Sequence, residues 1–407
     1  MDHRLVRGVE KALGWAGPSM LGSEFTRGGT LGPDLCARLL TPTKLLDLVM
    51  RRSLASPQLR CFRDGSELHP NSYISATTTK RGQGIHVPSM RRLGRLIESG
   101  CTLVLDSLEV FDPTMEVACR ALQWWSRELV QVNAYLTTHE ADGFNLHWDD
   151  HDVLVVQLAG EKSWEVRGSS RSAPMYRDAE QNQTPSDDLL WSGTLCAGEV
   201  MHIPRGYWHQ ATRSGHGAGF SLHVTFGFVK RTGVDWLTWL ADEVRESEVF
   251  RHDLDRWGTL EERVLQETEL ATIAANLAGS RPPSEFLAAR EEERPAHRHV
   301  ATGGTFGNPT SVVCVTEFPP RFEKHNGRID VFAAGKKITF AAGALPALEK
   351  LLSGSPAIID EVAATTGLDV AQLANVLIQE EICAELIPEL SLGYTDLITS
   401  GNCSKKP

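Results

Sequence analysis

The feature that most constrains the fold is a series of short runs between residues 131 and 230, each apolar or alternating and separated from the next by turns that often contain glycine. The runs are VNAYLTT, FNLHWD, DVLVVQLAG, KSWEVRG, GEVMHIP, YWHQAT and FSLHVTFGFV. Short runs of this kind, divided by turn residues, are typical of strands in a β-sandwich or barrel. The pattern therefore predicts a mainly β domain in this part of the chain.

Within this region, GEVMHIPRGYWHQAT has the pattern of a β-hairpin with a Pro-Arg-Gly turn. Its Gly198, Pro204, Gly206 and His209 have a spacing similar to that of a cupin barrel motif. The glycines permit tight turns, the proline presets one, and the following strand then directs His209 into the barrel. A histidine beside a turn is more often an ordinary surface or core residue, so a metal site requires further ligands.

Candidate ligands lie upstream, in HWDDHD. His147 and Asp149 are two residues apart, so on a strand they share one face while Trp148 and Asp150 take the other. With His209 they make a set of two histidines and one carboxylate, which leaves open positions on an octahedral ion, as non-haem Fe(II) oxygenases require. Zinc or manganese could also bind this set, and a solvated acidic loop is the alternative reading.

An oxygenase with this ligand set usually needs 2-oxoglutarate as co-substrate, and the far carboxylate of that molecule needs a cation. Lys162 is the candidate, although a lysine after a turn is by itself more often exposed. Tyr135 and Asn133 lie on one face of VNAYLTT, and Thr225 lies in SLHVTFGF. Polar groups on the inner face of a barrel need partners, which a carboxylate would provide.

Together, the stretches VNAYLTT, HWDDHDVLVVQLAGEKSWEV, GEVMHIPRGYWHQA and SLHVTFG resemble the JmjC-type oxygenases, most closely the ribosomal-oxygenase branch. The resemblance implies a double-stranded β-helix in which His147, Asp149 and His209 bind Fe(II). It also implies that Lys162, thirteen residues after Asp149, binds 2-oxoglutarate, with O2 as the second co-substrate. His202 and Gly227 depart from the family pattern, and the first 130 residues match it loosely.

The rest of the chain divides around this barrel. Residues Leu39–Ala55 and Met115–Val130 have helical patterns, and helices are also expected at about 234–254 and 260–279. After residue 300, strands are followed by three short helices and a final strand, an order similar to a winged helix. The predicted units are a JmjC/cupin catalytic domain (1–230), a helical dimerisation region with a charged linker (231–299), a winged-helix-like domain (300–396) and a flexible tail (397–407).

Partners follow from the resemblance and from charge. The resemblance implies a homodimer, and Trp236, Leu237 and Leu240 would form an apolar stripe on the first of the two helices. The net charge of −11 disfavours nucleic acid and anionic membranes and suits a basic protein or peptide. No apolar run reaches the roughly 18 residues of a membrane helix. The eight cysteines include no CxxC pair, which fits a reduced, cytoplasmic protein.

The leading hypothesis is an Fe(II)- and 2-oxoglutarate-dependent oxygenase that hydroxylates an amino-acid side chain in a protein or peptide. A tailoring hydroxylase of a free or carrier-bound amino acid, or of a peptide natural product, is the enzymatic alternative. A ligand-sensing cupin regulator that binds DNA is the alternative from another class. Its candidate recognition helix, VAQLANVLIQEE, carries no Lys or Arg, whereas phosphate contacts need positive charge.

Overall fold

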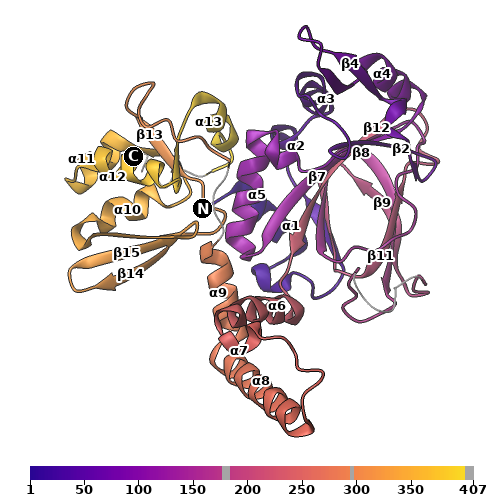
Figure 1. Ribbon diagram of the computed structural model, residues 1–407. Coiled ribbons are helices and arrows are strands. Elements are labelled where there is room, and N and C mark those ends of the chain that lie inside the picture. The colour runs from indigo at the N-terminus through magenta and orange to yellow at the C-terminus, as the bar shows by residue number, and fades with distance from the viewer. Residues whose placement is uncertain (177–183, 294–297, 399–407) are drawn as a thin grey trace.

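The computed structural model describes residues 1–176, 184–293 and 298–398. It has three parts, which follow one another along the chain (Figure 1). The first is a β-barrel wrapped by N-terminal helices, the second is an arm of helices that projects downward in the view, and the third is a smaller α/β domain beside helix α5. Among the described residues, no helix combines the length and the hydropathy needed to cross a bilayer.

The barrel is organised by one long strand, β8 (Asp152–Ser169). Its first half pairs with β10 and β12, and its second half pairs with β9 and β11, so β8 runs through both sheets of a double-stranded β-helix. The change occurs at Gly160, which has φ +65° and where a Cβ would lie 2.0 Å from the carbonyl oxygen of Phe220. The other barrel strands are β7 (Leu129–Thr138), β9 (Leu189–Cys196), β10 (Glu199–Ile203), β11 (Tyr207–Thr212) and β12 (Phe220–Val229).

Two local predictions in the barrel are wrong. β10 and β11 do not form a hairpin, because β10 pairs with β1 and the first half of β8 while β11 pairs with the second half. The turn between them therefore carries the chain from one sheet to the other. FNLHWD forms no strand, only an isolated bridge between His147 and His209. The two predicted runs DVLVVQLAG and KSWEVRG are halves of β8.

The N-terminal residues enlarge the first sheet and cover it. Its strand order is β1-β10-β8-β12-β7-β6-β2-β3, so strands from the first 105 residues lie at both edges. Asp112 caps α5 by accepting a hydrogen bond from the Met115 amide (3.0 Å), and Pro113 occupies the first helical turn. The helix ends at Ser126, four residues earlier than predicted, because Arg127 adopts φ +60°. The elements are α1 (Arg4–Leu13), β1 (Thr26–Thr30), α2 (Pro33–Leu39), α3 (Pro42–Arg51), β2 (Leu59–Arg63), β3 (Ser66–Glu67), β4 (Ile74–Thr78), β5 (Gly84–Pro88), α4 (Met90–Ser99), β6 (Thr102–Leu105) and α5 (Pro113–Ser126).

The arm consists of α6 (Gly233–Glu243), α7 (Glu248–Arg251), α8 (Leu260–Ser280) and α9 (Pro283–Glu293). The predicted linker therefore contains a helix, and the first predicted helix is split into α6 and α7. The expected stripe on α6 is also divided: Leu240 is buried, the Trp236 indole donates to the carbonyl oxygen of Arg281 (2.9 Å), and only Leu237 is largely exposed. Two of the three residues are thus used for packing within the arm.

The C-terminal part has its own core and two three-stranded sheets, β17-β13-β18 and β14-β15-β16. The three predicted helices are α10, α11 and α12, whereas β14 and α13 were not predicted; the winged-helix assignment stays a prediction. Leu397 and Ile398, placed in the flexible tail by prediction, are held instead: Leu397 is buried and its carbonyl accepts from the Arg4 amide (2.8 Å). The rest of that tail lies outside the described residues. The elements are β13 (Ser311–Cys314), β14 (Arg321–His325), β15 (Arg328–Ala333), β16 (Lys336–Ala341), α10 (Leu345–Leu351), β17 (Ala357–Ile358), α11 (Ile359–Thr366), α12 (Val370–Gln379), β18 (Cys383–Glu385) and α13 (Pro388–Tyr394).

Candidate active site

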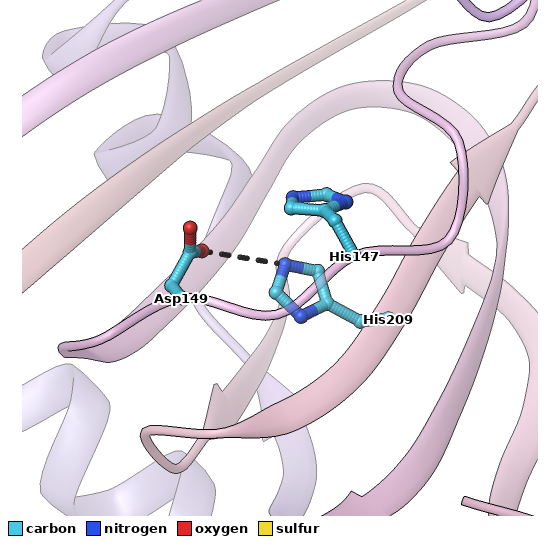
Figure 2. A group of neighbouring side chains, drawn as sticks. All are labelled: His147, Asp149 and His209. Atoms are coloured by element: carbon cyan, nitrogen blue, oxygen red, sulfur yellow. Dashed lines mark ion pairs between the residues drawn. The ribbon is translucent and has the colours of Figure 1, made fainter. Parts of the chain in front are cut away.

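His147, Asp149 and His209 meet at one point inside the barrel (Figure 2). One potential ligand atom from each residue lies within 4.8 Å of the other two. His209 comes from β11, and the other two come from the extended segment that crosses in front of it. The bridge between His147 and His209 brings the centroids of their rings to 4.4 Å.

Hydrogen bonds to backbone carbonyls orient both imidazoles. Nδ1 of His147 lies 2.8 Å from the carbonyl oxygen of Asn145, and Nδ1 of His209 lies 3.1 Å from that of Tyr207. A carbonyl can only accept, so each Nδ1 carries the proton and each Nε2 keeps a lone pair. This is the tautomer that a metal ligand needs.

The carboxylate of Asp149 is held from two sides. Its Oδ2 lies 3.5 Å from Nε2 of His209, and its Oδ1 accepts a hydrogen bond from the Tyr176 hydroxyl (3.2 Å). Burial alone would raise the pKa of Asp149, but the adjacent imidazoles of His209, His151 and His147 hold that pKa well below its usual range. Asp149 is therefore an anion at neutral pH. Asp150, by contrast, lies outside the cluster with a side chain that is 40% exposed.

A cavity of about 280 Å³ opens beside this cluster. All seven residues singled out in the sequence line it, together with eight others. The seven are Asn133, Tyr135, His147, Asp149, Lys162, His209 and Thr225, and the eight are Arg60, Phe144, His151, Val153, Val155, Trp164, Ala211 and His223. Strand alternation explains the match on β7, β8 and β12, where every second residue faces the barrel interior, whereas His147 and Asp149 are positioned by the bridge between His147 and His209.

Lys162 lies in the closed part of the barrel and is 1% exposed. Its Nζ donates to the hydroxyl of Thr137 (3.0 Å), and among the described residues it forms no ion pair. Burial lowers its pKa to about 7, although the charge of Asp142 raises it. A buried ammonium without a partner is costly, so this end of the cavity is built for an anion.

Polar side chains from β7 and β12 complete the wall. Burial raises the pKa of Tyr135 to about 12, while hydrogen bonds with Thr225 and Asn133 act against that rise. Tyr135 therefore stays protonated as a hydroxyl. Asn133 also accepts a hydrogen bond from the Ser107 amide (3.0 Å), which fixes its side-chain oxygen. Tyr135, Thr225 and Asn133 thus form one hydrogen-bonded group, separate from the Lys162–Thr137 contact.

Several residues of the cavity were not predicted. Arg60 reaches it from β2 and is held by two hydrogen bonds to Asp106 (2.7 and 3.0 Å). No spacing in the sequence ties β2 to the barrel, so this residue could not be found by pattern. Tyr176, which contacts Asp149 but does not line the cavity, gave no signal either, whereas His223 alternates with Thr225 along SLHVTFG and could have been noticed.

The two departures from the family pattern have local explanations. At Gly227 a Cβ would lie 2.8 Å from Cδ2 of His151, so glycine makes room for a histidine that lines the cavity. His202 lies outside that lining: its Nε2 accepts from the Gly22 amide (3.3 Å) and its Nδ1 donates to the carbonyl oxygen of Glu24 (3.0 Å). Its role is to anchor the N-terminal segment to β10.

Comparison with known proteins identifies relatives of this region. The JmjC domain family matches residues 110–232. Ribosomal oxygenase 1 of Gallus gallus is 31% identical over 175 residues, which are 40% of this chain and 28% of that protein. The bifunctional lysine-specific demethylase and histidyl-hydroxylase NO66 of Caenorhabditis elegans is 30% identical over 164 residues, 39% of this chain and 21% of that protein. The chain thus matches less than a third of the length of these relatives.

The likeness of fold extends over most of the chain. The structure of YcfD, a ribosomal oxygenase from Escherichia coli in complex with cobalt and 2-oxoglutarate, aligns with a TM-score of 0.54. The alignment covers 91% of this chain and 98% of that one, at 16% sequence identity. A second structure of E. coli YcfD gives a TM-score of 0.55 at 15% identity. The matched sequence, the barrel and its cluster of two histidines and an aspartate together show that this chain contains a JmjC domain of the cupin type.

Proposed function

We propose that the protein is an Fe(II)- and 2-oxoglutarate-dependent oxygenase that hydroxylates an amino-acid side chain of a protein or peptide. The observation that carries the proposal is the cavity in which the His147–Asp149–His209 cluster and the buried, unpaired Lys162 face one space. The sequence relatives include a protein named a histidyl-hydroxylase, and the fold aligns nearly end to end with a ribosomal oxygenase. The coverage of that alignment favours a protein substrate over a small metabolite.

The cluster fits a divalent iron ion. It offers two neutral imidazoles with free Nε2 lone pairs and one ionised carboxylate, which is the facial triad of non-haem Fe(II) oxygenases. His147, Asp149 and His209 would hold the ion and leave its remaining positions open toward the cavity.

The cavity fits 2-oxoglutarate. Lys162 is fully enclosed with one hydrogen bond to a neutral hydroxyl, so a carboxylate beside it would supply the missing counter-charge. Tyr135 and Thr225 add hydroxyl groups to the same wall. The far carboxylate of 2-oxoglutarate would bind at this end, with its keto-acid end toward the metal ligands.

The roles of the chain follow from these contacts. Bound Fe(II), with 2-oxoglutarate and O2, supplies the oxidising chemistry: one oxygen atom enters the substrate, the other enters succinate, and CO2 leaves. Lys162 binds and orients the co-substrate, and the tautomers of His147 and His209 are fixed by their carbonyl partners. Val153, Val155 and Trp164 line the cavity with apolar surface and restrict the entry of water.

A groove of about 600 Å³ adjoins the catalytic cavity, and His151 lines both. Its charged residues are of both signs: Asp150, Asp152, Arg171, Arg205, Lys230 and Arg231. We propose that a peptide segment beside the target residue lies in this groove. The net charge of −11 favours a basic substrate at long range, while the groove contacts provide local complementarity.

An uncoupled turnover assay tests the reaction. Iron-loaded protein given 2-oxoglutarate and O2 without substrate should release succinate slowly, and a His147→Ala variant should not. A peptide-library screen by mass spectrometry should then find a peptide that gains one oxygen atom. The absence of succinate from iron-loaded wild type would overturn the proposal.

We also propose that the arm is a homodimer interface. Large apolar side chains are exposed on it, including Trp257 at 89% and Leu254 at 76%. Figure 1 shows α8 extending away from both the barrel and the C-terminal part, and among the described residues these side chains remain exposed. Such a surface is typical of an interaction site, and a second copy would bury the same patch in return. The exposed members are Val234, Leu237, Leu254, Trp257, Leu260, Val264, Leu265 and Leu287.

Sedimentation tests the dimer. Wild type should sediment as a dimer at micromolar concentration, and the double variant Leu237→Asp/Trp257→Asp should sediment as a monomer. Phe306→Asp is the matched control, because Phe306 is 87% exposed but lies outside the arm. A monomeric wild type would reject this interface.

A further inference from the structure

His223 occupies an unusual position for a histidine without an assigned role. It lies on β12 and is 2% exposed, at the wall of the catalytic cavity. Its ring stacks on Tyr135, with centroids 4.7 Å apart and planes within 3°, and meets the Trp164 ring edge-on at 5.4 Å. Two aromatic neighbours therefore fix the plane of the imidazole.

Two polar atoms of this wall lack hydrogen-bond partners among the described residues. Among the described residues, Nδ1 of His223 and Nε1 of Trp164 are both buried without a hydrogen bond. Nearly all buried polar atoms in folded proteins have a partner, so each exception calls for one. The two unpaired nitrogens lie beside the same cavity as the Lys162 ammonium, which forms a single hydrogen bond. Together these groups indicate a ligand with several acceptor oxygens.

Charge favours an uncharged donor at this position. Burial, together with the charge of Lys162, holds the pKa of His223 well below its usual range. The imidazole is therefore neutral and carries one N–H. It adds a directional donor without adding a second positive charge beside Lys162, so one carboxylate suffices to balance the site.

We propose that His223 binds the co-substrate, donating a hydrogen bond from its imidazole to a carboxylate oxygen of 2-oxoglutarate beside Lys162. This inference rests on the proposed function. A lysine ammonium is a point charge on a flexible stem and fixes where the carboxylate lies. The hydrogen bond from the stacked ring of His223 would fix the rotation of that carboxylate. It would thereby orient the keto-acid end of 2-oxoglutarate toward the His147–Asp149–His209 cluster.

Titration of 2-oxoglutarate into Mn(II)-loaded protein, followed by calorimetry, tests the proposal. His223→Phe keeps an aromatic ring between Tyr135 and Trp164 but removes both nitrogens. It should weaken 2-oxoglutarate binding about tenfold or more, which corresponds to the loss of one hydrogen bond to a charged group. Mn(II) affinity, measured from free Mn(II) by electron paramagnetic resonance, should not change. His252→Phe, at an exposed histidine of the arm, is the matched control.

A second measurement does not depend on the folding of a variant. In Zn(II)-loaded wild type with 15N-labelled histidine, the ring nitrogen resonances of His223 should shift when 2-oxoglutarate is added. If the resonances did not change, or if wild type and His223→Phe bound 2-oxoglutarate equally well, the proposed role of His223 would be wrong, while the proposed function would stand. A wild type that binds Mn(II) but no 2-oxoglutarate would overturn the proposed function as well.

Discussion

The backbones of His147 and His209 are joined by two hydrogen bonds, from the His147 amide to the His209 carbonyl oxygen (3.1 Å) and from the His209 amide to the His147 carbonyl oxygen (2.7 Å). This pair fixes the separation of the two rings before any ion is present. The positions of the two histidines are therefore preorganised by main-chain contacts.

The first prediction concerns the ligands. His147→Ala, Asp149→Ala and His209→Ala should each abolish iron-dependent succinate release, because three ligands are needed to hold the ion with open positions. The fold should survive in each variant, since the backbone pair remains. Iron content and succinate release are the measurements. Asp150→Ala is the control and should keep most activity. If the Asp150→Ala variant lost iron and the Asp149→Ala variant retained it, the assignment of Asp149 as the ligand would be wrong.

The second prediction concerns Lys162. Lys162→Ala should weaken 2-oxoglutarate binding by at least about tenfold, or roughly 1.4 kcal/mol, because the carboxylate loses the ammonium enclosed at that end of the cavity. Iron binding should be unchanged, since Lys162 is not a ligand. Lys162→Arg should retain part of the affinity, as a guanidinium also pairs with carboxylates. Equal affinities of wild type and Lys162→Ala would show that the anion binds elsewhere.

The third prediction is a dependence on pH. In the empty cavity the pKa of Lys162 is about 7, so the ammonium form prevails below that pH and is lost above it. Carboxylate binding selects the ammonium, and 2-oxoglutarate affinity should fall as pH rises above about 7, by up to about tenfold per unit. Lys162→Arg should abolish this slope, because a guanidinium stays charged. Titrations at metal saturation across this range compare the two; parallel slopes would assign the proton to another group.

The fourth prediction concerns the contact between the barrel and the C-terminal part. Glu116 of α5 pairs with Arg120, which also donates to the Tyr394 hydroxyl (2.7 Å), and with His299 (2.8 Å). Burial would raise the pKa of Glu116, but the hydrogen bond with His299 and the charge of Arg120 lower it from 4.5 to about 2. Because the folded pKa is depressed, Glu116 stabilises the fold above about pH 4.5 and progressively loses that effect as pH falls toward 2.

Glu116→Gln should therefore lower the free energy of unfolding by about 2–3 kcal/mol at pH 7. The difference from wild type should shrink in urea titrations at pH 4 and below. Glu267→Gln, at an exposed position of α8, should have little effect at either pH. A difference that stays constant with pH would mean that Glu116 acts through packing and not through its charge.

The site residues of the barrel were predictable because strand alternation depends only on local spacing. Asn133 and Tyr135 share a face of β7 for this reason, whereas His147 and Asp149 lie on a segment that forms no strand and is positioned by the bridge between His147 and His209. The pairing of strands was not predictable in the same way. A tight turn joins β10 and β11, which is the local pattern of a hairpin. They belong to different sheets because β8 is long enough to pair with β10 along its first half and with β11 along its second half. Pairing is decided by long-range contacts that a local pattern does not contain.

Residues from remote segments show the same limit. Arg60 lines the cavity from a strand, and Tyr176 contacts Asp149 from a loop, and the positions of both segments are set by packing. The prolines and charges of this segment predict a linker where helix α9 lies, yet Pro283 occupies the first position of the helix, where proline is tolerated. The position of a segment with few apolar residues depends on its tertiary contacts, and a local sequence pattern does not contain those contacts.

The passage of β8 through both sheets has a consequence for how the molecule opens. Two sheets with no shared strand could separate without breaking hydrogen bonds between strands. Here β8 contributes half of its length to each sheet, so neither sheet can separate unless the strand pairing of the other is also disrupted. Amide hydrogens on the two sides of Gly160 should consequently exchange with solvent as one cooperative unit, slowly and at the rate of global unfolding. The floor of the cavity, which includes Val155 before the bend and Lys162 after it, would then be the most slowly exchanging part of the chain and the arm the fastest.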